Sequence, residues 1–389
     1  MKCLSLFTEL RARNRWVHSS DVRALGLFAL CFPLSIGYGH ESARATSQPP
    51  QAISDSGGTV RVPAFELPLS VYMSTEARKS LLQQLHAQPF DLRAVPAEKI
   101  AALRKTMSAQ LPPLLKHFQE QYRVNVSQTM MAGIRTHVIT PKDGVAADNR
   151  DRVLINLHGG GFLFGDSGGI GLVESIPIAA LGHIEVISVD YRLGPEYQFP
   201  AASEDVTSVY RELLKRFDSK SIGIYGCSAG GLLTAQAAAW IQKEHLPRPG
   251  ALGIFCASAD ARWAGDSYFT VPALTGQVAP APGAPPNYLS KYYYGNNDLT
   301  DPLMSPVLSP EVLSAFSPTL ILTGTRAPEL SAAVHTDTEM TKAGVTTELH
   351  VWDGMWHGFL MDPDLPESQE AYKVIVRFFG HHLGKASPK

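Results

Sequence analysis

The sequence predicts an α/β fold with a mainly parallel sheet that carries helices on both faces. Two observations support this prediction. From residue 153 onward, short apolar runs typical of buried strands alternate with segments of helical periodicity. One of these runs, Ile222–Tyr225, leads straight into a glycine-rich turn and then into a stretch of small, helix-prone residues. A strand, a turn and a helix in this order are the repeating unit of α/β proteins.

Strands and helices follow one another along most of the chain. Strands are expected at Gln128–Thr140 (one strand or two), Val153–Leu157, Ile184–Val189, Ile222–Tyr225, Leu252–Cys256, Leu320–Thr323 and Glu348–Trp352. Helices are expected at about 171–181, 202–217, 229–244, 330–343 and 368–380. Residues at about 260–316 interrupt this rhythm because they are rich in Pro, Tyr, Asn and Gly. We interpret them as a lid insertion over the functional site.

The N-terminal 45 residues resemble a secretory signal peptide with a long first region. Residues 1–23 carry five basic and two acidic side chains, and residues 24–39 carry no charge. Ala43-Arg44-Ala45 fits a small-x-small cleavage site. The apolar run is short and contains Pro33, so we expect no stable membrane insertion of the mature chain. We predict export to the periplasm or the medium. The alternatives are an uncleaved anchor and a misassigned start codon. If the chain is not exported, the protein is expected to be cytoplasmic.

The rest of the chain divides into three parts. Residues 46–74 begin with a polar stretch that contains Pro and Gly, which indicates a linker. Residues 75–125 carry apolar side chains at three- and four-residue spacing, interrupted by Pro112-Pro113. They precede the first convincing strand, so we interpret them as an N-terminal helical cap. Residues 126–385 form the expected catalytic domain.

Length, composition and cysteine spacing are those of an ordinary globular protein. A chain of 389 residues can hold one large domain with an elaboration, and 44% hydrophobic and 18% charged residues are ordinary for a globular protein. A net charge of −2 gives no reason to expect a nucleic-acid partner. The four cysteines show neither metal-ligand spacing nor a disulfide framework. We expect Cys227 and Cys256, which lie in apolar surroundings, to be buried thiols.

Ser228 is the candidate nucleophile, at the centre of Gly226-Cys227-Ser228-Ala229-Gly230. The G-x-S-x-G spacing makes a turn so tight that side chains at the two glycines would collide with the neighbouring strand and helix. The turn lifts the serine hydroxyl out of the sheet and directs a helix N-terminus at the group that it attacks. The pentapeptide alone also occurs in chance turns. A dinucleotide loop is disfavoured because the G-x-G-x-x-G spacing is absent.

Two further motifs follow strands. His158-Gly159-Gly160-Gly161-Phe162 exposes backbone N–H groups that could form an oxyanion hole, with a flexible turn as the alternative. We expect His158 to hold this loop by hydrogen bonds. The second motif, residues 190–196 (DYRLGPE) with Phe199-Pro200-Ala201-Ala202 and the acidic pair at 204–205, is expected to connect loops through ion pairs, without a catalytic role.

His357 is the candidate base. It lies between glycines just after the last expected strand, and it follows the serine in the order serine, acid, histidine. Together HGGGF, DYRLGPE with FPAA, GCSAGG and GMWHGF resemble the α/β-hydrolases of the hormone-sensitive lipase group, which include bacterial carboxylesterases and lactone hydrolases. The resemblance covers about residues 75–385, with the four motifs in the family's order.

The resemblance implies an eight-stranded sheet with a helical cap. It implies Ser228 as nucleophile, His357 as base, and an oxyanion hole formed by the backbone N–H groups of Gly159, Gly160 and Ala229. No metal or organic cofactor is implied. One departure from the family pattern is Cys227, where relatives usually carry an aspartate.

The triad acid is the second departure. Many relatives carry an aspartate where this chain has Ala327, and alanine cannot accept the imidazole N–H. Glu329 lies two residues further and reaches one methylene further than an aspartate, so we predict that it serves as the acid. Asp353, four residues before His357, is the reserve candidate. The alternative role for Glu329 is a helix N-terminal charge.

These residues predict a serine hydrolase that forms an acyl-enzyme from a small-molecule ester of short-to-medium acyl length or from a lactone. Two alternatives stay open. A non-catalytic small-molecule-binding protein could use the same fold, although retention of Ser228 and His357 argues against it. Hydrolysis of an amide or a carbamate would need the same residues.

Overall fold

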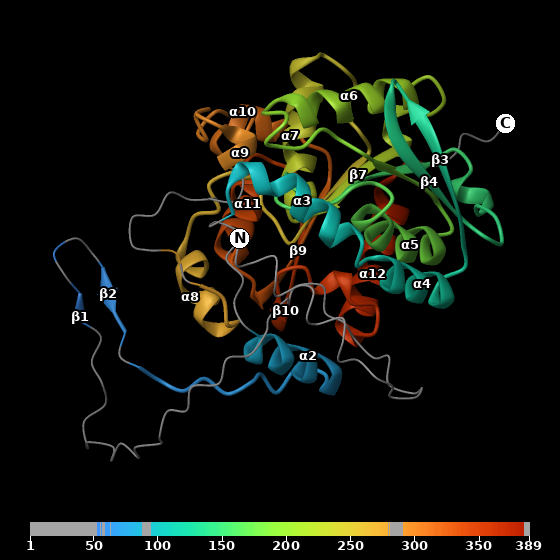
Figure 1. Cartoon of the computed structure of the whole chain (residues 1–389). Coiled ribbons are helices and arrows are strands. Elements are labelled where there is room, and N and C mark those ends of the chain that lie inside the picture. The colour runs from blue at the N-terminus through green and yellow to red at the C-terminus, as the bar shows by residue number, and fades with distance from the viewer. Residues whose placement is uncertain are drawn as a thin grey trace.

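The computed structural model describes residues 53–54, 56, 59–62, 64–87, 95–278, 280 and 291–384. The signal-peptide-like segment at 1–45 lies outside the described residues and stays a prediction. A two-stranded antiparallel ribbon, β1 (Ile53–Ser54) and β2 (Val60–Arg61), lies at the end of an arm away from the main sheet (Figure 1).

An eight-stranded sheet forms the centre of the molecule, in the order β10-β9-β8-β7-β5-β6-β4-β3. Its strands are β3 (Val124–Met131), β4 (Ile134–Pro141), β5 (Val153–Leu157), β6 (Glu185–Val189), β7 (Ile222–Cys227), β8 (Ala251–Phe255), β9 (Thr319–Arg326) and β10 (Thr347–Trp356). Strands β10 to β6 pair in parallel, whereas β4 and β3 pair antiparallel at one edge. The predicted fold, a mainly parallel eight-stranded sheet, is confirmed.

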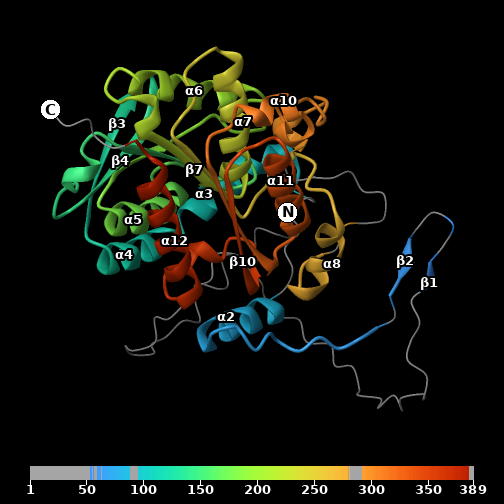
Figure 2. The ribbon, with the colours of Figure 1, turned by 180° about the vertical axis from the view of Figure 1, so that it is seen from behind.

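Helices cover both faces of this sheet, as predicted. One face carries α5 (Ile170–Gly182) and α12 (Pro366–His382), which lie side by side (Figure 2). The other face carries α6 (Ala201–Leu213), α7 (Ala229–Lys243) and α11 (Leu330–Lys342), of which α6 and α7 pack on each other (Figure 1). The expected helices therefore form, although α6 ends four residues earlier than the predicted 217.

Two hydrophobic clusters form the core, one on each face. The strands supply them alternately: Val153 and Ile155 pack toward α6 and α7, whereas Leu154 packs toward α5 and α12. This two-residue period follows from the pleat of a strand. Cys227 and Cys256 are buried free thiols in the cluster beneath α5, as expected.

The N-terminal helices α2 (Thr75–His86), α3 (Ala97–Ser108) and α4 (Pro112–Gln121) confirm the helical periodicity of this region, and Pro112 begins α4. They pack in different places. Apolar residues of α2 and α4 join the core cluster of α5 and α12. In contrast, α3 packs through Ile100 against Leu163 and Phe164, just after the HGGG motif. The cap boundary itself stays a prediction.

The interruption at 260–316 contains α8 (Asp266–Leu274), α9 (Lys291–Tyr294) and α10 (Pro310–Ser314). Its last part is not a separate cover. Met304, Val307 and Leu313 are buried in the core cluster on the face of the sheet that α6 and α7 cover. The expected lid is therefore shorter at this end, because these apolar side chains complete the layer over the sheet. Residues 279 and 281–290 lie outside the described part of the chain.

Parallel strands end at the same edge of a sheet, and ligand sites of α/β folds lie there. The loops after β5, β7, β9 and β10 leave this edge. They carry the HGGG motif, Ser228, Glu329 and His357, respectively. The strand order thus places the four segments next to one another, although they are up to 200 residues apart along the chain.

Candidate active site

Ser228 lies at the turn between β7 and α7 in a left-handed backbone conformation, with φ of 59°. Such a φ is unfavourable for a residue with a side chain and is typical of strained functional positions. The tightness of the turn has the predicted cause. A Cβ atom at Gly226 or at Gly230 would overlap the carbonyl oxygen of Leu157 on the neighbouring strand. Glycine at both positions therefore allows Ser228 to project beyond the sheet edge.

The structure brings Ser228, His357 and Glu329 into one hydrogen-bonded chain. The Nε2 atom of His357 lies 2.8 Å from the Ser228 hydroxyl oxygen, and its Nδ1 atom lies 2.9 Å from Glu329 Oε2. Thr323 donates to the other carboxylate oxygen of Glu329 at 3.2 Å. Glu329 is completely buried, with 0% exposure. The geometry is that of a nucleophile, a base and an acid that orients the base.

Asp353, the reserve acid, does not reach His357. Its carboxylate accepts hydrogen bonds from Thr325 and Ser70 and lies toward solvent. Glu329 precedes the first residue of α11, but its side chain makes no capping hydrogen bond there. The geometry thus favours Glu329 as the acid, and it separates this residue from the alternative role of helix capping.

The electrostatics of His357 are dominated by two opposing effects. Burial lowers the pKa of the imidazole because it disfavours the charged form. The charge and hydrogen bond of Glu329, with a smaller contribution from Cys256, outweigh this effect and raise the pKa to about 9. The arrangement stabilises the imidazolium that forms when His357 removes a proton from Ser228.

One of the predicted oxyanion-hole donors is wrong. The N–H group of Gly159 donates to Glu174 Oε1 at 2.8 Å, so it is already occupied. Among the described residues, the N–H groups of Gly160, Gly161 and Ala229 have no protein acceptor. Gly160 and Gly161 both have positive φ, 124° and 63°, which glycine adopts readily. These three groups are the donors available near Ser228.

The HGGG loop is fixed by hydrogen bonds on both sides. Tyr191 donates to the carbonyl of His158 at 2.6 Å, and the two rings stack with their centroids 4.2 Å apart. His158 is buried, and its Nδ1 atom lies 2.8 Å from the carbonyl oxygen of Gly159, as expected for a residue that holds the loop. On the outer side, Arg104 of α3 donates to the carbonyls of Leu163 at 2.7 Å and Gly194 at 2.8 Å.

The ion pairs predicted for residues 190–205 are confirmed. Asp190 pairs with Arg135 of β4, and Arg192 pairs with Glu204 and Asp205 of α6. These contacts connect the loop after β6 to an edge strand and to a helix, and none of them involves Ser228 or His357.

Three further residues that shape the site were not predicted from the sequence. Gly161 belongs to the glycine run, so the signal was present. Glu174 is the one charged residue in the apolar helix α5, which is an unusual position for a carboxylate. Trp263 lies with its ring centroid 5.4 Å from that of His357, in the first part of the expected lid. No pattern of spacing points to Trp263, because its contact with His357 is made across the fold.

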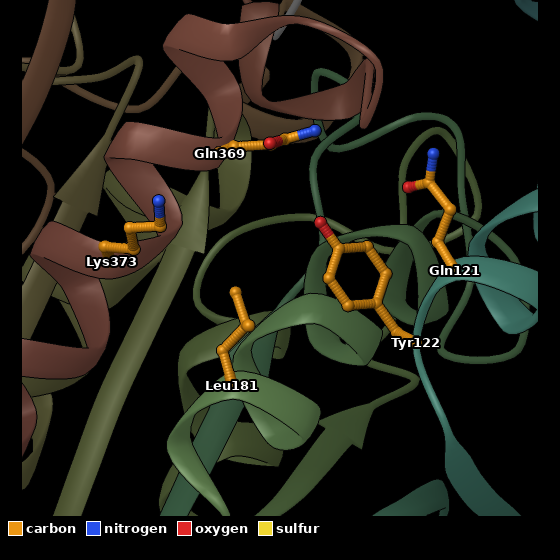
Figure 3. Close-up of a pocket in the computed structure, with 5 residues that line it drawn as sticks. All are labelled: Gln121, Tyr122, Leu181, Gln369 and Lys373. Carbon is orange, nitrogen blue, oxygen red and sulfur yellow. The ribbon is translucent and has the colours of Figure 1, made fainter.

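A surface hollow lies away from the candidate active site. A hollow of about 290 Å³ is lined by Gln121, Tyr122, Leu181, Gln369 and Lys373 (Figure 3). These residues come from α4 and its end, α5 and α12, so the hollow is separate from Ser228.

Within the described residues, no group of His, Cys, Asp and Glu side chains is arranged to hold a metal ion. The same part of the chain contains no helix that is long and apolar enough to span a membrane.

Comparison with known proteins places this geometry in context. A family model described as alpha/beta hydrolase fold matches residues 154–361. The versiconal hemiacetal acetate esterase of Dothistroma septosporum is 26% identical over 341 residues, which cover 81% of this chain and 94% of that protein. The crystal structure of an esterase, E25, is similar with a TM-score of 0.74 and 28% identity, over 83% of this chain and 99% of its own. An esterase from the bacterial hormone-sensitive lipase family has a TM-score of 0.66 and 25% identity, over 80% and 99% of the two chains.

Proposed function

We propose that this chain cleaves esters through an acyl-enzyme on Ser228. The chain belongs to the α/β-hydrolase fold family, and it is a carboxylic ester hydrolase of the hormone-sensitive lipase group. The observation that carries the proposal is the chain of contacts from Ser228 through His357 to the buried Glu329. An isolated serine hydroxyl is a weak nucleophile at neutral pH, and an adjacent oriented base activates it.

In the first half of the reaction, His357 Nε2 removes the hydroxyl proton while Ser228 Oγ attacks the ester carbonyl carbon. Negative charge develops on the carbonyl oxygen, and the N–H groups of Gly160, Gly161 and Ala229, which have no acceptor among the described residues, are the proposed donors that stabilise it. The imidazolium then gives its proton to the departing alkoxide, so that the alcohol leaves and the acyl group stays on Ser228.

In the second half, His357 removes a proton from water, which attacks the acyl-enzyme. The same donors stabilise the second tetrahedral intermediate, and the carboxylic acid leaves as Ser228 regains its proton. Glu329 keeps Nδ1 protonated, so that Nε2 is free to act as the base throughout. Besides the ester, water is the one reactant that these steps consume.

The substrate is proposed to be an ester with a short-to-medium acyl group, or a lactone. The relative from Dothistroma septosporum is named for an acetate ester, which supports a short acyl group. Trp263, next to His357, supplies an apolar wall on the histidine side of the site.

The test is hydrolysis of p-nitrophenyl esters from acetate to octanoate, with lactones and a p-nitroanilide amide as further substrates. Ser228→Ala should lower kcat/KM at least about 100-fold, a change of about 2.7 kcal/mol in the barrier, without loss of the fold. Ser208→Ala, on the distant helix α6, is the matched control and should leave activity unchanged. A Ser228→Ala protein that keeps more activity than this would overturn the covalent mechanism. A wild-type protein inactive on every substrate would favour the binding function.

A further inference from the structure

A carboxylate that the proposed reaction does not use lies directly beneath the oxyanion loop. Glu174 projects from α5, otherwise an apolar helix, toward the sheet. Its Oε1 atom accepts the N–H of Gly159 at 2.8 Å, and its Oε2 atom accepts from the side-chain amide of Asn156 at 2.9 Å. Asn156 in turn accepts from Ser188 of β6 at 2.9 Å. A hydrogen-bonded chain therefore runs from the middle of the sheet to the first glycine of the loop.

Gly159 is held between this carboxylate and the nucleophile turn. A Cβ atom at Gly159 would lie 3.3 Å from Glu174 Oε1, 3.1 Å from the carbonyl oxygen of Cys227 and 3.5 Å from Ser228 Cβ. The carboxylate, the glycine and the turn are thus in close contact with one another. A shift of the Gly159 peptide would be transmitted to its neighbours on both sides.

The contact also explains which donors are free. The Gly159 N–H points back to Glu174, and the chain then turns at Gly160 and Gly161, both with positive φ. The N–H groups of these two glycines have no protein acceptor in the described structure. Without the carboxylate, the Gly159 N–H would lack its buried partner, and the peptide would be free to rotate. Leaving a buried donor unpaired is unfavourable, so the loop would rearrange.

The state of the carboxyl group fits this position. Burial raises the pKa of Glu174 to about 8, against the opposing effect of the hydrogen bonds from Asn156, Gly159 and Cys227. The raised pKa favours the uncharged form of the carboxyl group, which does not repel the negative charge that develops on the substrate oxygen.

We propose that Glu174 is a positioning residue for ester hydrolysis, which holds the Gly159 peptide so that the next N–H groups face the substrate oxygen. The inference rests on the proposed function, because it assigns to that reaction a residue that touches neither substrate nor nucleophile. Glu174 shares a small cavity of about 20 Å³ with Cys227, so an acidic side chain placed at 227 would reach the same space.

The experiment compares Glu174→Ala, the double variant Glu174→Ala/Cys227→Asp, and Ile178→Ala with the wild type on p-nitrophenyl butyrate. Glu174→Ala should lower kcat about 10- to 100-fold with KM changed less than about threefold, because the donors act mainly on the transition state. The same substitution should lower the affinity for a boronic acid, which forms a tetrahedral adduct with Ser228, by a similar factor. Ile178 lines the same cavity one turn further along α5 and tests lost packing alone, so kcat should be unchanged even where the melting temperature falls.

The double variant separates positioning from packing. If Glu174 acts by positioning, kcat of Glu174→Ala/Cys227→Asp should be at least about tenfold higher than kcat of Glu174→Ala. Glu174→Ala with wild-type kcat, or with KM raised and kcat unchanged, would overturn the inference. Equal losses in Glu174→Ala and Ile178→Ala would also overturn it, because they would make Glu174 a packing residue. An inactive wild type would instead contradict the proposed function.

Discussion

Glu329→Gln is the substitution that most directly tests the role of the buried acid. Glutamine has nearly the same size, so it keeps the packing against Thr323 while it removes the negative charge. It also places an amide N–H where a carboxylate oxygen now faces His357 Nδ1. The imidazolium would lose its charge partner, and the imidazole would be held in the wrong tautomer.

The size of the effect follows from the pKa of His357. The carboxylate holds this pKa at about 9, against an ordinary value of 6.5 and against the effect of burial. That difference corresponds to about 3 kcal/mol of stabilisation of the imidazolium, or roughly 300-fold in rate. Loss of the correct tautomer adds to it, and the corresponding change in a serine protease costs about 10⁴-fold in kcat. We therefore expect kcat of Glu329→Gln to fall by between about 300-fold and 10⁴-fold.

The assay is the pH profile of kcat for p-nitrophenyl butyrate, corrected for spontaneous hydrolysis. Neutral imidazole is the base, so wild-type activity should rise with pH through about 9. Removing the carboxylate lowers the pKa, so the rising limb of Glu329→Gln should move to lower pH. The loss of kcat in Glu329→Gln must be measured between the high-pH plateaus of the two profiles. At pH 7 the loss is smaller, because much of the wild-type His357 is protonated there.

The matched control is Asp353→Asn, which removes a carboxylate from the same side of the sheet. Asp353 contacts Thr325 and Ser70 rather than His357, so kcat should stay within about threefold of the wild type. A Glu329→Gln protein that keeps more than a tenth of the plateau kcat would contradict the role of Glu329 as the acid. A rising limb at the same pH as in the wild type would also contradict it. A larger loss in Asp353→Asn would identify that residue as the acid.

The remaining predictions concern stability, the loop and export. Because the folded-state pKa of His357 lies above its ordinary value, its contribution to stability is complete below about pH 6.5 and is lost as pH rises through about 9; urea unfolding of wild type and His357→Gln at pH 6 and 10 measures it. Arg104→Ala frees the carbonyls of Leu163 and Gly194, and kcat/KM should fall about 5- to 10-fold, whereas Glu196→Gln should be mild. Gly160→Ala should lower kcat about 100-fold, because a Cβ atom would overlap the Phe164 carbonyl; an active variant would contradict this. Mass spectrometry of protein from the native host should find a chain that begins near Thr46, and a cytoplasmic chain that retains Met1 would disprove export.

Much of the fold could be predicted because its signals are local. A buried parallel strand is a short apolar run, and the six expected between 153 and 352 lie within four residues of the observed bounds. The tight turn at Ser228 likewise depends on neighbours in the chain, so its glycines identified it in advance. Strand ends are also what place His158 and His357, since a motif that directly follows a parallel strand must lie at one edge of the sheet.

The fold class, the nucleophile candidate and the base candidate could be predicted from the sequence alone, because they follow from short local patterns and from the order of these patterns along the chain. It left Glu329 and Asp353 as alternatives for the acid. The tertiary structure separated them, since the distance to His357 depends on how β9, β10 and α11 pack. The same limit explains the error at Gly159. A run of glycines leaves the peptide orientation open. Here Glu174, fifteen residues further along the chain, accepts the first N–H, and the next two N–H groups have no acceptor among the described residues.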